Sequence, residues 1–308
     1  MDPNPGPANG SAGAVLALAS SMAIAGSSVV VAKIIVADLP IFLANELRFG
    51  IAAAILVPAY VLTNGGISRV SRRDSAILVG QALTGVFAFN VLLFYGVQFT
   101  SAIEAGIITS TAPALVAVLA IVFLNDRPTK ATIAGTLLAI LGVVALEVFG
   151  GTASSSHGPN PLLGNALILG AVFGEALFTI LGKTVSDRVS PLEIATAASV
   201  LGVAFFFPFA LYELTWFDPR TVNVTAWLPV VYYGVVVTVV AFVLWFHGLA
   251  TVPASTAGVF TAVLPVSAAV LSIVLLDEPF GLSHGVGILF VLGAVVLTSR
   301  GLRNGSSS

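Results

Sequence analysis

Residues 105–113 read "AGIITSTAP" and residues 257–265 read "AGVFTAVLP", so the two stretches share one frame of alanine, glycine, threonine and proline. Each stretch lies inside a long apolar run. Proline removes one backbone hydrogen bond and bends a helix, while nearby hydroxyl groups can satisfy the freed backbone. The two copies stand 152 residues apart, which predicts that the chain consists of two related halves.

The composition predicts a membrane protein. Hydrophobic residues make up 57% of the chain, charged residues make up 8%, and the mean hydropathy is +1.06. A soluble domain typically has about 25% charged residues, so this chain has too few to cover a water-facing surface. The net charge of −2 argues against a nucleic-acid partner. The absence of cysteine and the scattered placement of the three histidines predict no metal site and no cofactor.

Ten apolar runs are long enough for membrane-spanning helices, which need about 20 residues each. The runs are residues 12–35, 40–63, 75–97, 101–124, 131–149, 161–183, 191–214, 226–248, 254–276 and 283–300. Short breaks with turn-forming residues separate them. The expected fold is therefore an all-α membrane protein with ten transmembrane helices. Residues 1–11 are predicted to form a disordered lead, and residues 301–308 a tail that is native or in part a remnant of cloning.

The distribution of Lys and Arg predicts the orientation in the membrane. If the N-terminus is cytoplasmic, the loops and tail on that side hold nine Lys and Arg residues and the opposite side holds two. Cytoplasmic segments of membrane proteins carry an excess of these residues. Both termini are therefore expected to be cytoplasmic.

The repeat extends beyond the opening stretches. A shift of 152 residues pairs Gly106 with Gly258, Thr109 with Thr261, and Pro113 with Pro265, and a shift of 150 pairs Lys33 with Lys183. The predicted halves are residues 12–150 and residues 160–300, each with five spans. Because five is odd, the halves must insert in opposite orientations. Such inverted repeats are typical of secondary transporters, whose substrate site lies between the halves near the middle of the membrane.

Several motifs resemble the drug/metabolite transporter superfamily and, within it, the EamA-type exporters, which include bacterial aromatic amino-acid exporters. These motifs are Lys33 closing the first span, "PIFLANELRF" opening the second, and "LNDRP" and "LLDEP" ending the fourth and ninth. The resemblance implies export of amino acids or similar metabolites across the bacterial inner membrane. It also implies that the fifth and tenth spans pack outside a central cavity. Family members often carry Trp eight residues before the Lys of spans one and six, where this chain has Ala25 and Glu175.

The leading hypothesis is a secondary transporter that exports small amphipathic metabolites, above all amino acids including aromatic ones, by alternating access. A multidrug carrier, or a carrier of other metabolites such as nucleotide sugars, is the alternative. An enzyme is not expected because the sequence offers no nucleophile and base in a recognisable arrangement. The expected partners are a small-molecule substrate and the lipid bilayer, and the chain is expected to be a monomer.

Glu175 and Asn90 are the first candidates for a substrate cavity. Glu175 lies near the middle of the sixth span, where a charge is costly. It could bind a substrate amine or a proton, or it could be a protonated packing residue. Asn90 shares one helical face with Phe87 and Phe94, and an amide among aromatic rings suits an amphipathic solute. The alternative for Asn90 is a hydrogen bond between helices.

Further cavity candidates come from the eighth span and from the repeated motif. Thr238 and Trp245 share a helical face, although Trp245 could instead belong to the aromatic belt at the membrane surface. Thr109 and Thr261 precede prolines at matched positions. Pro113 and Pro265 are predicted to bend spans four and nine beside the cavity.

Lys33, Glu46 and Arg48 cluster at the outer ends of the first two spans and form a candidate gate. The alternative is that the long cations reach toward the lipid headgroups and that Glu46 and Arg48 form a local ion pair.

Overall fold

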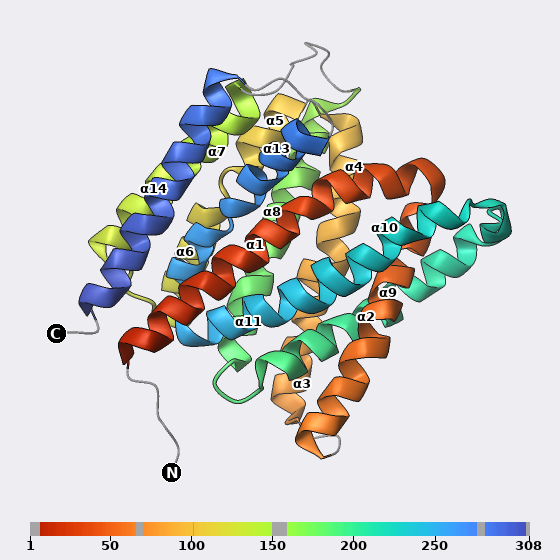
Figure 1. Cartoon of the computed structure of the whole chain (residues 1–308), viewed down its shortest axis with the longest axis horizontal. Helices are drawn as coiled ribbons and strands as arrows, with labels where there is room; N and C mark the ends of the chain where they lie inside the picture. Colours follow the sequence, from red (N-terminus) through yellow and green to blue (C-terminus); the bar gives the residue numbers. More distant parts are fainter. Residues whose placement is uncertain (1–6, 66–69, 101, 150–158, 276–280, 306–308) are drawn as a thin grey trace.

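The computed structural model describes residues 7–65, 70–100, 102–149, 159–275 and 281–305, and this part of the chain is helical without strands (Figure 1). Its α-helices are α1 (Pro7–Asp38), α2 (Ile41–Asn64), α3 (Arg72–Gln81), α4 (Phe89–Phe99), α5 (Ala102–Thr109), α6 (Ala112–Leu124), α7 (Lys130–Phe149), α8 (Pro161–Val185), α9 (Pro191–Glu213), α10 (Trp227–Tyr232), α11 (Ala241–Thr251), α12 (Ala254–Phe260), α13 (Val263–Leu275) and α14 (Leu282–Gly305). Two π-helical segments, η1 (Ala82–Ala88) and η4 (Tyr233–Val240), and two short 3₁₀ turns, η2 (Pro219–Thr221) and η3 (Val224–Ala226), complete the set.

The described residues contain nine stretches long and apolar enough to cross a membrane. The fifth expected span corresponds to α7, where the apolar stretch Lys130–Leu146 is shorter than the other nine. Helix α1 already begins at Pro7, inside the expected lead, because the first turn of a helix tolerates proline. Helix α14 continues to Gly305, inside the expected tail. Residues 1–6 and 306–308 lie outside the described part of the chain.

Side chains at the helix ends explain where several spans begin. The Ser71 and Ser190 hydroxyl groups accept hydrogen bonds from the backbone at the starts of α3 and α9. Asn160 does the same for α8, which then opens with Pro161. These side chains satisfy amide groups that have no partner within the first turn. The polar turn residues between the apolar runs are therefore the helix starts.

Helices α2 and α9 pack along each other and are joined near both ends. Helix α2 follows Pro40, which offers no side-chain cap. Instead, the Glu213 carboxylate from the end of α9 accepts a hydrogen bond from the Leu43 amide at 2.7 Å. At the other end of the pair, the Tyr60 hydroxyl donates to Glu193 Oε1 at 2.7 Å. Polar contacts therefore fix the register of this helix pair.

The helices pair in a repeating way. Helix α1 packs against α11 and α13, while α8 packs against α4 and α6. Helix α7 packs against α14, and these two lie together at one edge of the molecule (Figure 1). Figure 1 also shows that α1 begins and α14 ends on the same side of the bundle. Each of these packings joins an element of the first half to an element of the second.

Irregular helix geometry recurs at matched places. The π-helical segments η1 and η4 begin 151 residues apart. The fourth span is interrupted between α5 and α6 by a turn at residues 110–111, and the ninth is interrupted between α12 and α13 at residues 261–262. Hydroxyl groups bond to nearby carbonyls at both breaks: Ser110 Oγ donates to Ile107 O at 2.6 Å, and Thr261 Oγ1 donates to Gly258 O at 2.8 Å.

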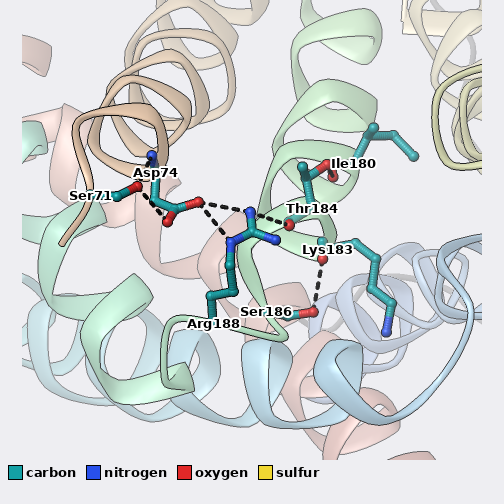
Figure 2. Close-up of polar contacts among 7 residues, drawn as sticks. All are labelled: Ser71, Asp74, Ile180, Lys183, Thr184, Ser186 and Arg188. Atoms are coloured by element: carbon teal, nitrogen blue, oxygen red, sulfur yellow. Dashed lines mark hydrogen bonds and ion pairs between the residues drawn. The ribbon is translucent and has the colours of Figure 1, made fainter.

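A polar cluster ties the start of α3 to the connection between α8 and α9 (Figure 2). The Arg188 guanidinium donates to Asp74 Oδ1 at 2.7 Å and to the Thr184 carbonyl at 3.1 Å. Hydrogen bonding to Asp74 raises the pKa of Arg188 above its ordinary value. Close by, Lys183 Nζ donates to the carbonyls of residues 249 and 250 at the end of α11. The connections on this side of the bundle are therefore joined to one another.

Candidate functional site

Two adjoining cavities lie between the two halves of the chain. They measure about 160 Å³ and about 170 Å³. Phe89, Glu175, Thr261 and Leu264 line both of them. Ligand pockets usually measure about 300–1,000 Å³, so together the two cavities suit a small metabolite. Helices from both halves form their walls.

Glu175 lies where the two cavities meet. Its backbone carbonyl accepts a hydrogen bond from Thr179 Oγ1 at 3.4 Å. Within the part of the chain that the structure describes, no group donates a hydrogen bond to the Glu175 carboxylate and no cation forms an ion pair with it. A carboxylate inside a helical membrane bundle is costly. Glu175 therefore presents an acid group to the space between the halves.

The predicted face of Asn90, Phe87 and Phe94 is divided in the structure. Asn90 lines the first cavity, and its amide nitrogen donates to the Val86 carbonyl at 2.6 Å. Phe87 instead packs on α9, with its ring 5.1 Å from the Phe206 ring, and neither Phe87 nor Phe94 is among the residues lining the two cavities. For Phe87 the cause is η1, because a π-helix turns less per residue than the α-helix assumed in that prediction. Phe94 lies one turn after Asn90 on the α-helix α4, so η1 does not account for its position.

Thr238 and Trp245 both line the first cavity. The Thr238 hydroxyl donates to the Tyr233 carbonyl at 3.0 Å, a contact across five residues that the π-helical geometry permits. Trp245 is 3% exposed, and its indole Nε1 is buried without a hydrogen-bond partner in the structure. Trp245 thus lies inside the bundle rather than at its surface.

The two bent spans contribute the wall of the second cavity. Thr109, Pro113, Thr261 and Pro265 all line it, so the structure brings the four motif residues together. They lie at the breaks between α5 and α6 and between α12 and α13.

The candidate gate residues separate in the structure. Arg48 lines the first cavity, where its guanidinium carbon lies 4.3 Å from the Phe49 ring centre and 4.4 Å from the Tyr233 ring centre. Glu46 is two positions away on α2 and has a buried carboxylate oxygen without a hydrogen-bond partner. Residues two apart on a helix do not face each other, which explains why no ion pair joins them. Lys33 lies within α1, and its side chain is outside the described residues.

Sequence reasoning did not identify the aromatic part of the first cavity. Phe89, Phe178 and Phe242 line it, and nothing in an apolar span distinguishes such rings from lipid-facing ones. Ala25 and Glu175, the positions where the resemblance leads one to expect Trp, both line this cavity. At these two positions its wall carries a methyl group and an acid.

Comparisons with known proteins match most of the helical part of the chain. Residues 12–147 and 162–300 match the EamA-like transporter family. The "Uncharacterized transporter YetK" of Bacillus subtilis (strain 168) is 46% identical over 287 residues, covering 93% of this chain and 86% of that protein. The "Probable terminal-alkyne amino-acid exporter" of Streptantibioticus cattleyicolor is 30% identical over 239 residues, covering 77% of each protein.

A solved crystal structure has the same fold as this chain. It superposes with a TM-score of 0.77 and 19% sequence identity, covering 92% of this chain and 97% of that one. The relatives named above carry the names of transporters. Together with the apolar spans, the family match over both halves shows that the chain belongs to the EamA-like transporter family, within the drug/metabolite transporter superfamily, and is a multi-pass protein of the inner (cell) membrane.

Proposed function

We propose that this membrane transporter exports small amphipathic metabolites, in particular amino acids including aromatic ones, by alternating access. The observation that carries the proposal is the cavity pair between the halves, where aromatic rings surround one acid, one amide and several hydroxyl groups. Apolar walls with a few polar groups are typical of sites for small organic solutes. The relative named as a probable amino-acid exporter supports the same class of substrate.

The proposal includes ten spans in two inverted halves. The two separate stretches that match the family support a duplication. The pairing of helices between the halves and the matched irregular segments agree with a two-fold relation. The start of α1 and the end of α14 lie on one side of the bundle, as two cytoplasmic termini require.

The arrangement of the bent spans supports a conformation that is open to the outside. Helices α6 and α12, which would be the cytoplasmic halves of spans four and nine, pack against each other. Helix α5 packs on α7 and α8, whereas α13 packs mainly on α1. The Asp126 carboxylate adds a contact on the closed side, because it accepts hydrogen bonds from the Ser255 amide at 3.0 Å and the Ser255 hydroxyl at 2.7 Å.

A multidrug carrier is the second candidate function, and one observation favours it. Glu175 stands beside Phe89 and Phe178 in the first cavity, and an acid among aromatic rings also suits a lipophilic organic cation.

Reconstitution into proteoliposomes tests both candidates. Vesicles loaded with single labelled amino acids are expected to release at least one of them down its gradient, and protein-free vesicles are the control. Glu175→Gln should slow this release and alter its dependence on pH. If folded protein moves no amino acid but moves lipophilic cations, the multidrug function replaces the proposed one.

A further inference from the structure

Arg48 and Glu175 are the charged side chains among the described residues that line the two cavities. The other lining groups are apolar side chains, hydroxyl groups, the Asn90 amide and the Trp245 indole. The first cavity therefore contains one cation and one anion, contributed by the two different halves of the chain. Each charge is costly inside a membrane bundle unless a partner compensates it.

The Arg48 guanidinium is held in place by its surroundings. The side chain is 7% exposed and lies between the Phe49 and Tyr233 rings, at 4.3 Å and 4.4 Å from their centres. Its Nε atom is buried and has no hydrogen-bond partner. Contact with aromatic rings fixes the guanidinium plane and partly stabilises its charge. Tyr233 adds a single hydroxyl group, and neither it nor the two rings match the fork of N–H donors, which fits the oxygen pair of a carboxylate.

We propose that Arg48 binds the carboxylate of the solute while Glu175 binds its cationic group, so that the cavity selects zwitterions over solutes with a single charge. The inference rests on the proposed transport function and assigns the chemistry of its substrate site. Amines without a carboxylate leave Arg48 uncompensated, and acids without an amine leave Glu175 uncompensated. Arg48 also distinguishes amino acids from the lipophilic cations that Glu175 alone would attract.

The position of the two charges implies an orientation for the bound solute. Arg48 is seven residues from the start of α2, and Glu175 is 14 residues from the start of α8. In the proposed topology both helices start at the outer side, so Arg48 lies nearer that side. The solute therefore leaves with its carboxylate toward the outside.

Binding can be measured without transport because Trp245 lines the same cavity. The chain has three tryptophans, and Trp216→Phe with Trp227→Phe leaves Trp245 as the single reporter. Its fluorescence is titrated with phenylalanine, phenylethylamine and 3-phenylpropionate, which share one ring and differ in their charged groups. Phenylalanine should bind roughly 10- to 100-fold more tightly than either of the others, as expected for a lost charge-assisted hydrogen bond.

Two variants assign the two charges. Arg48→Gln should remove the preference for phenylalanine over phenylethylamine, and Arg48→Lys should restore it in part, because a lysine keeps the charge but not the fork of donors. Glu175→Gln should weaken phenylalanine and phenylethylamine but leave 3-phenylpropionate unchanged. Size-exclusion profiles and thermal midpoints check that each variant is folded. The three ligands are also compared on the protein that keeps both Arg48 and Glu175, and this comparison stands even if a charge variant fails to fold.

Several results would overturn the inference. These are equal binding of phenylalanine and phenylethylamine, an unchanged preference in folded Arg48→Gln protein, or no fluorescence response to any of the three probes. Failure of the proposed function looks different. If vesicles release no amino acid while the titration still shows binding that depends on Arg48, the zwitterion site stands and the export function does not.

Discussion

Replacing Gly258 with alanine tests whether the contact between α6 and α12 closes the cavities toward the cytoplasm. A Cβ atom at Gly258 would lie 2.8 Å from Val116 Cγ1 and 2.9 Å from Val116 Cβ, and Val116 is fully buried. Overfilling a packed contact of this kind costs about 1–3 kcal/mol. The cost applies only while the two helices touch, so the variant should favour the opposite conformation. The ratio of the two conformations should shift roughly 5- to 140-fold.

The lack of native cysteine makes this shift measurable. Ser28 lines the first cavity, and Ser28→Cys provides a single thiol there. In inside-out vesicles, an impermeant maleimide reaches this thiol only in the conformation open to the cytoplasm. The labelling rate therefore follows the population of that minor conformation and should rise with Gly258→Ala.

Gly50→Ala is the matched control, since no atom lies within 4 Å of a Cβ atom at Gly50. It should leave the labelling rate at the level of the parent protein. If Gly258→Ala also leaves that rate unchanged, the contact between α6 and α12 does not hold the cavities closed, and the assignment of the open side is wrong.

Three further substitutions test the packing of the bundle through thermal or denaturant unfolding in detergent. Phe206→Ala removes a fully buried ring that stacks on a neighbouring phenylalanine and should cost about 3–5 kcal/mol, and a loss below about 1 kcal/mol would mean that the site collapses around the gap. Glu213→Ala removes the acceptor of the Leu43 amide and should cost about 1–3 kcal/mol, and unchanged stability would show that water replaces this contact. Asp126→Ala leaves the Ser255 amide without its acceptor and should cost about 1–2 kcal/mol. It should also speed the labelling of the Ser28→Cys thiol from the cytoplasmic side. A labelling rate equal to that of the parent protein would show that Asp126 does not help to hold α6 and α12 together.

Much of the architecture could be predicted from the sequence because membranes impose strong rules. Long apolar runs had to be helices, since no other open structure satisfies its backbone inside lipid. The prediction of the family, which combined the spans with short motifs such as "LNDRP" and "LLDEP", is confirmed. Glu175, Asn90 and Thr238 were selected as polar groups within spans. Trp245 was selected for the face that it shares with Thr238, and Thr261 for its place in the repeated motif. All five line the first cavity.

The limits of prediction have a physical cause in helix geometry. The face assigned to Phe87 assumed a regular α-helix, and nothing in "ALTGVFA" signals a π-helical segment. Arg48 was assigned to a gate because it lies near the end of its run, whereas the structure places it in the first cavity between Phe49 and Tyr233. Periodicity and depth both follow from sequence position, but the direction of a side chain depends on its neighbours in space.

The matched segments η1 and η4 also bear on the history of the chain. A π-helical turn contains one more residue than the α-helical turn it replaces, so it is the natural trace of a single inserted residue. Under the proposed duplication, one insertion inherited by both halves requires fewer events than two separate insertions at matched positions. Under that duplication, one inherited insertion would explain both segments, which begin 151 residues apart.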